Sequence, residues 1–388
     1  MCRVSNDHLF RPNFVVCSLY PTLNLISPPP FFQLAMIPSF ARRLSAGALR
    51  VAILQPRLAT VPSPVNQCRL FSSMTATNSS SDSGYPKYFA FDELENDVFR
   101  AKHLKSGSGT NTAVYGGLLF SQALAAAEKT VTSEFTPNAL HSMFILNASP
   151  NTPVDYKVRR LRDGRSFCTR IVDAEQTGKL VFTCQVSFHV KEEGAVSHSV
   201  HMPDVPPPEA LISDIEGCKL FIQEEKEAKR EIPKMQLIRM IQRVEELEGE
   251  ETLFEMRPTD LDAFFALKPM VLQPFYFWFK CPRNLPNDPM LHRWLVSYIT
   301  DSTLVSAAYR PHVSRGFVPS MMFSLDHSVW IHEPEFRADE WMLYEVTSTV
   351  AKNGRAMANA KFWTRDGRLV MTAVQECLIR SRGSTSRI

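Results

Sequence analysis

An internal repeat restricts the fold of this chain more than any other feature, because the sequence after residue 85 reads as two copies of one pattern. In the first copy, Tyr115-Gly116-Gly117 opens a run of alanines and leucines that is typical of a buried helix. Strand-like segments follow, separated by glycine-containing turns. The predicted elements are a helix at residues 118–127 and strands at 141–146, 154–162, 166–174 and 179–190.

The second copy repeats this order. Tyr298-Ile299-Thr300-Asp301 opens a shorter helix, His327 to Trp330 lie on a strand, and three more strands run to Arg380. The turns also correspond, because Asp163-Gly164 in the first copy matches Asn353-Gly354 in the second. Both dipeptides tolerate positive φ at the two central positions of a type I′ turn, so they predict antiparallel hairpins. One helix followed by an antiparallel sheet, present twice, predicts an α+β fold.

The repeat predicts how the chain is divided into domains. Between the copies, the proline-rich stretch 203–208 ends the first sheet, and the mixed charges of residues 224–231 predict a solvated helix that needs no partner. The predicted segments are an N-terminal extension at 1–84, a first domain at 85–203, a charged linker with helical insertion at 204–252, a second domain at 253–382 and a tail at 383–388.

Bulk composition excludes several classes of protein. Hydrophobic residues make up 44% and charged residues 21% of the chain, which is typical of a soluble globular protein. The formal net charge of +3 is too small to indicate nucleic acid or an anionic membrane as the partner. Pro28, Pro29 and Pro30 interrupt the only candidate for a membrane span. The cysteines show no C-x-x-C spacing and are expected to be free thiols: Cys2, Cys17, Cys68, Cys168, Cys184, Cys218, Cys281 and Cys377.

The two ends of the chain predict different organelles. Between Asp7 and Asp82 there is no Asp, Glu or Lys, and the arginines and serines of this segment are typical of a mitochondrial presequence. The alternative is an upstream extension of the gene, with the true start at Met36 or Met74 instead of Met1. At the other end, Ser386-Arg387-Ile388 approximates the S-K-L address of peroxisomal proteins.

One polar side chain breaks the apolar face of the last predicted strand. The chain contains no G-x-S-x-G serine-hydrolase elbow, no G-x-x-x-x-G-K-[ST] phosphate-binding loop and no H-E-x-x-H zinc motif. Alternation places Gln375 on the same face as Ala373 and Cys377, where an unpaired buried amide would cost about 1–3 kcal/mol. Alignment of the copies sets Val186 opposite Gln375, Asn138 opposite Ser324 and Gly117 opposite Asp301. A functional site in the second copy alone explains this difference.

Each of these residues also has a structural interpretation. Asp301 is equally consistent with a helix N-cap, which is a common role of aspartate. Ser324 is consistent with a small strand residue, and Gln375 with an amide that satisfies a neighbouring strand end. His141 and His327 each lie among strand residues, where core or rim packing explains them without catalysis.

Several separate stretches, in the right order, resemble a known family over about residues 88–380. They are Val114-Tyr115-Gly116-Gly117 with Ser121-Gln122-Ala123-Leu124, the stretch 161–167, Ser324-Leu325-Asp326-His327-Ser328-Val329-Trp330-Ile331-His332, and Val374-Gln375-Glu376. This pattern is similar to bacterial thioesterase II and the eukaryotic peroxisomal-type acyl-CoA thioesterases. The resemblance implies two tandem hot-dog domains, each an antiparallel sheet wrapped around a central helix. It also implies hydrolysis of fatty acyl-CoA to fatty acid and coenzyme A, in the peroxisomal matrix, without a metal or other cofactor.

In that family, an Asp, a Ser or Thr, and a Gln hold the catalytic water, and these positions match Asp301, Ser324 and Gln375. Orphan amides at a helix N-terminus stabilise negative charge, so the Gly116-Gly117 turn is the candidate oxyanion donor. Two alternatives remain: a hot-dog acyl-CoA-binding module and an enoyl-CoA hydratase-like lyase. The hydratase needs a histidine close to its aspartate, and the first one after Asp301 is His312, eleven residues on. The sequence leaves acyl chain length open and is compatible with a homo-oligomer.

Overall fold

The computed structural model describes residues 86–107, 112–248, 252–381, 383 and 386. The predicted extension at 1–84, with its presequence-like pattern and alternative start codons, lies outside the described residues, and so do Arg387 and Ile388 of the C-terminal tripeptide. Among the described helices, none is both long and apolar enough to cross a membrane.

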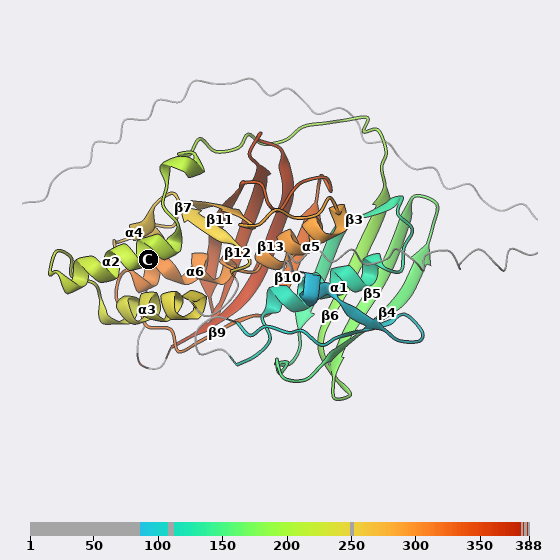
Figure 1. The fold of residues 1–388 in the computed structure, drawn as a ribbon, viewed down its shortest axis with the longest axis horizontal. Helices are drawn as coiled ribbons and strands as arrows, with labels where there is room; N and C mark the ends of the chain where they lie inside the picture. Colours follow the sequence, from blue (N-terminus) through green and yellow to red (C-terminus); the bar gives the residue numbers. More distant parts are fainter. Residues whose placement is uncertain (1–85, 108–111, 249–251, 382, 384–385, 387–388) are drawn as a thin grey trace, which may run out of the picture. The chain divides into compact units, whose positions relative to one another are not determined.

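The first half of the described chain contains one long helix and a set of antiparallel strands, as predicted (Figure 1). Two short strands that the sequence did not predict, β1 and β2, precede the helix. The elements are η1 (Pro86–Phe89), β1 (Phe91–Glu93), β2 (Val98–Ala101), α1 (Gly116–Glu128), β3 (Phe135–Phe144), β4 (Val154–Asp163), β5 (Phe167–Gln176) and β6 (Lys179–Val190).

The second half follows after two connecting helices and a short 3-10 turn, namely η2 (Pro208–Ala210), α2 (Asp214–Lys226) and α3 (Lys234–Glu248). Its elements are β7 (Glu255–Pro258), α4 (Leu261–Phe264), β8 (Phe275–Lys280), α5 (Pro289–Ile299), α6 (Leu304–Val313), β9 (Met321–Ser324), β10 (Asp326–Ile331), β11 (Met342–Lys352), β12 (Arg355–Thr364) and β13 (Leu369–Arg380). The sequence predicted one helix opening at Tyr298 to Asp301. Instead, α5 ends at Ile299, and Asp301 lies in the break before α6.

All described strands belong to one antiparallel sheet, which joins the two halves (Figure 1). The strand order is β1-β2-β4-β5-β6-β3-β10-β13-β12-β11-β8-β7, and β9 also pairs with β13. The order is symmetric about the β3–β10 pair, because β6 and β13, β5 and β12, and β4 and β11 hold equivalent places on its two sides. Helix α1 packs on the strands of the first half and α6 on β11, β12 and β13. The predicted double hot-dog fold is therefore confirmed.

The hairpin turns agree with the sequence in all but one case. Asn353 and Gly354 have φ values of 55° and 74°, and Thr177 and Gly178 have 50° and 75°, as a type I′ turn requires. The prediction for Asp163-Gly164 is wrong, because neither residue has positive φ and β4 connects to β5 through a longer loop. In that loop the Gly164 amide donates to the Phe167 carbonyl at 2.9 Å.

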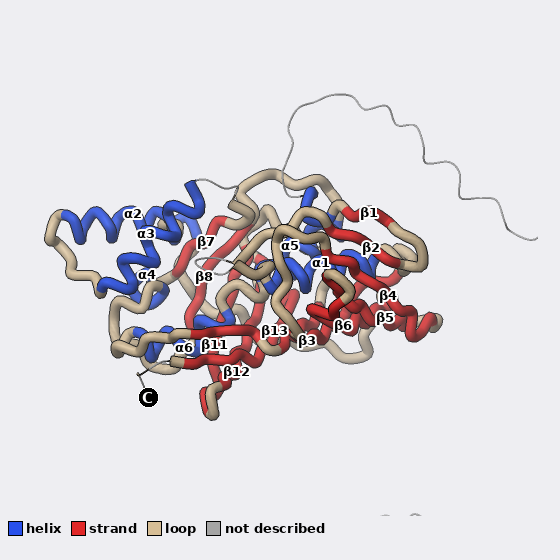
Figure 2. Tube along the Cα trace, turned by 90° about the horizontal axis from the view of Figure 1, so that it is seen from below, coloured by secondary structure: helices blue, strands red, loops and turns tan. Residues whose placement is uncertain are grey.

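The connecting segment is folded rather than merely solvated. The predicted helix at 224–231 is wrong in its extent, because α2 ends at Lys226. A small core formed by Cys218, Phe221, Ile232 and Met240 holds α2 and α3 together beside the second half (Figure 2). The exact boundaries of the domains remain a prediction.

Among the described cysteines, Cys168, Cys184, Cys218, Cys281 and Cys377 are free thiols, as expected, and all five are buried.

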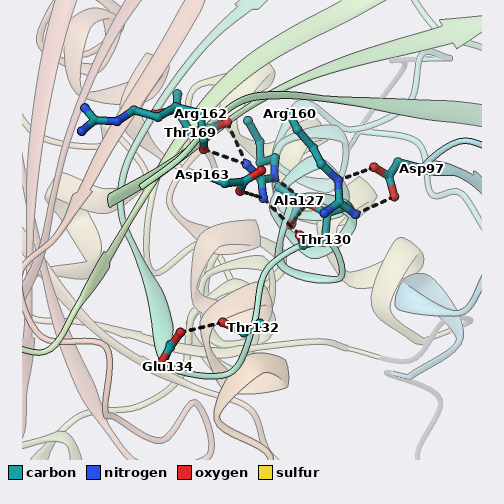
Figure 3. A network of polar contacts seen from close by, with 10 residues as sticks. Asp97, Ala127, Thr130, Thr132, Glu134, Arg160, Arg162, Asp163 and Thr169 are labelled. Atoms are coloured by element: carbon teal, nitrogen blue, oxygen red, sulfur yellow. Dashed lines mark hydrogen bonds and ion pairs between the residues drawn. The ribbon is translucent and has the colours of Figure 1, made fainter. Parts of the chain in front are cut away.

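One arginine of the first half is buried between helix and sheet, and its guanidinium is hydrogen-bonded. Arg170 is 1% exposed, and its guanidinium donates to Thr130, to the carbonyls of Arg162 and Thr169, and to the carboxylate of Asp163 (Figure 3). An arginine can be buried at low cost only when its donors are used in this way.

A second buried pair fastens α1 to α5. Arg293 donates to Glu128 Oε1 from Nε at 3.0 Å and from Nη2 at 2.7 Å, and Trp294 Nε1 donates to Glu128 Oε2. Glu128 and Arg293 are each 5% exposed. Because α1 belongs to the first half and α5 to the second, this pair crosses between the repeats.

Candidate active site

Asp301 lies at the break between α5 and α6, and it is 8% exposed. The tyrosine hydroxyl of Tyr344 donates to the Thr300 carbonyl at 2.6 Å, which fixes the backbone at this break. The N-cap of α6 is Thr303, so the structure assigns the N-cap role to a different residue than Asp301. The carboxylate of Asp301 is thus free to point toward the sheet.

The sheet brings the two other predicted residues to Asp301. Ser324 ends β9 and pairs across the sheet with Cys377 of β13, and Gln375 lies two residues earlier on the same face of β13. Gln375 is fully buried, as the alternation predicted. Its Nε2 donates to Ser324 Oγ at 2.7 Å, and Ser324 Oγ donates to Asp301 Oδ1 at 3.2 Å. The three side chains therefore form one hydrogen-bonded chain that ends on a carboxylate.

His327 lies beside this chain, next to Gln375, which the sequence did not predict. Its Nε2 is 2.8 Å from the hydroxyl oxygen of Thr300, the residue before Asp301. The β10–β13 register pairs Ser328 with Val374, so His327 and Gln375 are the next cross-strand neighbours. Gln375 Oε1 and His327 Nδ1 are both buried without a hydrogen-bond partner among the described residues. Burial lowers the pKa of His327 to about 3, and the polar side chain of Gln375 nearby offsets part of this effect. The ring is therefore neutral near pH 7.

The same register corrects the alignment of the two copies. In that alignment the two His-Ser dipeptides were matched, which set Asn138 opposite Ser324. His141 is exposed and His327 is fully buried, so this match joins residues on opposite faces of the sheet. In the first half, Leu140 pairs with Val186, both buried, at the place where the second half has His327 beside Gln375. The first half thus has an apolar pair in place of a polar one, and Val186 does correspond to Gln375.

The environment of Asp301 favours a carboxyl group that titrates near neutral pH. Burial raises the pKa of Asp301 to about 6, although hydrogen bonds from Gln375, from Ser324 and from the Gly117 amide act in the opposite direction. Gly117 lies in the first turn of α1, where helix amides favour a neighbouring negative charge. A carboxyl group of this pKa can accept a proton from water when the pH is above about 6.

Gly116 and Gly117 allow α1 to approach Asp301 this closely. A Cβ on Gly116 would lie 2.8 Å from Asp301 Oδ2, and a Cβ on Gly117 would lie 2.2 Å from the Tyr298 carbonyl oxygen. No side chain fits at either position without displacing the neighbouring backbone or carboxylate. The two glycines therefore lie close to Asp301, while their approach to substrate and their role as oxyanion donors remain predictions.

A cavity of about 490 Å³ lies near the break between α5 and α6, where Ile299, Ser302 and Thr303 line it. Two helices each contribute one face to its wall, because the lining residues recur at helical spacing. The face of α6 and its N-cap consists of Thr303, Ser306, Arg310 and Val313, and the face of α3 consists of Gln236, Arg239, Met240, Arg243 and Glu246. The remaining wall includes Tyr115, Leu253, Phe254, Met256, Phe264, Tyr298 and Ile299. The connecting segment thus lines part of this cavity. Its charge pattern did not predict this role.

Comparisons with known proteins agree with this architecture. Residues 105–189 match the family model described as acyl-CoA thioesterase N-terminal domain, and residues 242–379 match the one described as acyl-CoA thioesterase C-terminal domain. The chain is 34% identical to acyl-coenzyme A thioesterase 8 of mouse over 295 residues, which is 76% of this chain and 88% of the mouse protein. It is 24% identical to peroxisomal acyl-coenzyme A thioester hydrolase 1 of Saccharomyces cerevisiae, over 72% of this chain and 89% of the yeast protein.

A solved structure gives the same result. The crystal structure of an acyl-CoA thioesterase II from Mycobacterium marinum is 29% identical in sequence and superposes with a TM-score of 0.59. The match covers 77% of this chain and 99% of the bacterial one. The similarity therefore extends over both halves of the described chain.

Proposed function

This chain belongs to the acyl-CoA thioesterase family and is a thioester hydrolase, and from that premise we propose that it cleaves fatty acyl-CoA with a water held by Asp301, Ser324 and Gln375. One observation carries the proposal: these side chains come from three separate segments and meet in a single hydrogen-bonded chain that ends on a buried carboxylate. The first half of the chain has no such arrangement at the equivalent strand positions, so we expect one catalytic centre per chain.

In this mechanism the ionised carboxylate of Asp301 takes a proton from the water while the water oxygen attacks the thioester carbonyl carbon. Ser324 and Gln375 hold the water in line with that carbon, which removes the entropic cost of orienting it. The carbon–sulfur bond then breaks, and the proton on Asp301 passes to the sulfur of coenzyme A. No group other than the three side chains and the water is needed for the proton balance.

The negative charge that develops on the carbonyl oxygen needs hydrogen-bond donors. The amide of Gly116 is the candidate, because it occupies the first position of α1, where no intrahelical carbonyl can accept from it. The Gly117 amide is directed at Asp301 instead. In this assignment the Gly116 amide donates to the oxyanion, and the Gly117 amide donates to the Asp301 carboxylate.

The geometry favours hydrolysis over the hydratase alternative. His312, the first histidine after Asp301, lies at the end of α6, and its Nδ1 is 3.0 Å from the hydroxyl of Ser386. His327 does adjoin the site, but burial lowers its pKa to about 3, so near pH 7 its ring is neutral and is too weak a base to activate water. A binding module without catalysis would have no need for a carboxylate kept in the reach of both a hydroxyl and an amide.

The proposal is tested by release of free coenzyme A from a panel of acyl-CoA substrates. We expect Asp301→Ala to lose hydrolysis while its circular dichroism spectrum stays that of the wild type. The matched control is Asp204→Ala, which removes an exposed aspartate in the connecting segment and should leave activity unchanged. A folded Asp301→Ala variant with wild-type release would refute the assignment. Hydration of an enoyl-CoA or binding without turnover, measured in parallel, would favour one of the two alternatives.

We propose peroxisomal import through Ser386-Arg387-Ile388, which the name of the yeast relative supports. The competing expectation is mitochondrial import through the arginine- and serine-rich N-terminal segment. Two fluorescent fusions separate them: one lacking residues 386–388 and one lacking residues 1–84. Loss of peroxisomal signal only in the first fusion supports import through the tail.

The protein is also expected to self-associate, and light scattering on the purified protein tests this expectation.

A further inference from the structure

His327 is a buried polar side chain that adjoins Gln375 and that the proposed mechanism does not use. It is fully buried, and its ring packs against Phe120 of α1 in a T-shaped arrangement, with the ring centroids 4.7 Å apart and the planes at 72°. Its Nε2 lies 2.8 Å from the hydroxyl oxygen of Thr300, the residue before Asp301. These two contacts fix the orientation of the ring, and with it the position of Nδ1.

Two buried polar atoms of this pair of side chains lack partners. Nδ1 of His327 and Oε1 of Gln375 have no hydrogen bond among the described residues, although the β10–β13 register makes the two residues cross-strand neighbours. Buried polar atoms are almost always paired, because an unsatisfied one destabilises the fold. The pKa of His327 agrees with a contact here, since the Gln375 side chain offsets part of the effect of burial, as an acceptor oxygen near a ring N–H does.

The position of the single ring proton decides whether these atoms are satisfied. Burial lowers the pKa of His327 to about 3, so near pH 7 the neutral ring carries one proton, on either Nε2 or Nδ1. A proton on Nε2 is donated to Thr300, and His327 Nδ1 and Gln375 Oε1 are then two buried acceptors without a donor. A proton on Nδ1 is available to Gln375 Oε1, and the Thr300 hydroxyl then donates to Nε2.

The second arrangement costs less than the first. The Thr300 hydroxyl also lies 2.7 Å from the Ser297 carbonyl oxygen, and it has only one proton to donate. A proton on Nδ1 of His327 therefore takes this donor from the Ser297 carbonyl, which belongs to the last turn of α5, where carbonyls lack an intrahelical partner in any case. One acceptor loses a donor in this arrangement, whereas two acceptors have none in the other.

A donor at Nδ1 also decides which end of the Gln375 amide meets Ser324. With Oε1 held by His327, the amide nitrogen faces Ser324 Oγ, as the 2.7 Å contact shows, and Ser324 keeps its one proton for Asp301 Oδ1 at 3.2 Å. In the reversed amide, Ser324 would donate to Oε1 instead. Its oxygen would then face the ionised carboxylate with no proton between them, which would disrupt the site that holds the water.

Resting on the proposed thioesterase function, we propose that His327 carries its proton on Nδ1 and donates it to Gln375 Oε1, and so holds the Gln375 amide in the orientation in which Ser324 donates to Asp301. His327 is then a positioning residue, because it acts through Gln375 and not on the water itself. The first half has the buried pair Leu140 and Val186 at the equivalent strand positions, so it lacks both members of this hydrogen bond.

Two substitutions of His327 separate its ring nitrogens. The amide nitrogen of Asn is bonded to Cγ, as Nδ1 is, whereas that of Gln lies one atom further out, as Nε2 does. In His327→Gln, kcat for acyl-CoA hydrolysis should fall about 10- to 100-fold with KM nearly unchanged, because a misplaced water costs rate rather than binding. His327→Asn should recover part of this loss, and equal kcat values in the two folded variants would overturn the proposal. The control is His332→Leu, which removes an exposed histidine whose Nε2 is 3.0 Å from the Thr372 hydroxyl and should leave kcat unchanged.

A double-mutant cycle distinguishes positioning from a general structural role. His327→Leu should lower kcat about 10- to 100-fold in the wild type but have little further effect in Gln375→Val, because the amide that it orients is already absent. The double variant carries the Leu and Val pair that the first half already holds in its core. Additive losses would overturn the proposal. If Gln375→Val alone keeps wild-type kcat, the assignment of Gln375 to the water fails, which is a failure of the proposed function.

Nuclear magnetic resonance of the wild-type chain tests the tautomer without a variant and without turnover. The side-chain nitrogens of ¹⁵N-labelled histidine report which of the two carries the proton, and the signals of His327 are identified by magnetisation transfer from the Phe120 ring. We expect a neutral ring with its proton on Nδ1 at pH 7, well above the pKa of about 3. A proton on Nε2 would overturn the proposal even in an active enzyme. A proton on Nδ1 in a chain that hydrolyses no acyl-CoA would support the hydrogen bond and refute the proposed function.

Discussion

Replacement of Asp301 by Asn should separate the catalytic role of this carboxylate from its effect on stability. Asn has almost the same shape as Asp but cannot accept a proton from water, so we expect hydrolysis to fall by a factor of at least about 100, the lower part of the range for a lost general base. In the wild type, kcat/KM should rise with pH through an apparent pKa of about 6, because only the ionised carboxylate is active.

The same substitution should stabilise the fold at alkaline pH. Burial raises the pKa of Asp301 from 3.8 to about 6, so the folded state binds a proton more tightly than the unfolded state does. Its contribution to stability is then fully present below pH 3.8 and is lost as pH rises through about 6. A difference of about two between the pKa values corresponds to about 3 kcal/mol at pH 8, at about 1.4 kcal/mol for each tenfold change.

Urea unfolding of wild type and Asp301→Asn at pH 5 and pH 8 measures this effect. The stability of the variant relative to the wild type should grow by about 1.4 kcal/mol between the two pH values, because the other half of the effect lies below pH 5. The comparison between pH values is the informative quantity, because the amide of Asn loses one acceptor toward Ser324 or Gly117 at any pH. Asp288→Asn at the N-cap of α5 is the control, since Asn caps a helix as well as Asp does. A relative stability of Asp301→Asn that does not change with pH would refute the reasoning.

Other substitutions test the surroundings of the site. Gln375→Val, which installs the residue type of the first half, should lower kcat about 10- to 1000-fold with a smaller effect on KM, and an unchanged kcat would exclude the amide from the reaction. Gly117→Ala should destabilise the protein by about 1–3 kcal/mol in urea unfolding, because the new methyl would lie 2.2 Å from the Tyr298 carbonyl; a neutral effect would mean that α1 can move away. Arg293→Met should cost about 3–5 kcal/mol by leaving the Glu128 carboxylate buried alone, and Tm should recover in part when Glu128→Gln is added.

The strand pattern of this chain was predictable because it is local. Alternation along a strand depends only on neighbouring residues, so the inward face of Gln375 followed from Ala373 and Cys377 on either side of it. The Asn353-Gly354 turn was predictable for the same reason, since a dipeptide determines its own φ preference. Asp163-Gly164 shows the limit of this reasoning, because the longer loop to Phe167 overrode the same preference.

The sequence did not predict groups whose role depends on partners far away in the chain. Helix α5 was not predicted, because its residues follow a strand whose position was not predicted either. The break after α5, where Asp301 lies, was therefore not predicted. His327 looked equivalent to His141, and only the register of β10 against β13 turned it toward Gln375. A shift of one residue moves a side chain to the other face of a sheet, and no local pattern records it.

The sequence alone therefore determined the repeat, its two α+β halves and, through the family resemblance, the three residues that match the catalytic positions. Only the tertiary structure decided that those residues form one hydrogen-bonded chain and that the connecting segment lines a cavity. The physical reason is the range of the interactions. Helix and strand periodicity arise between residues a few positions apart, whereas a hydrogen-bonded site and a cavity arise where segments distant in sequence meet.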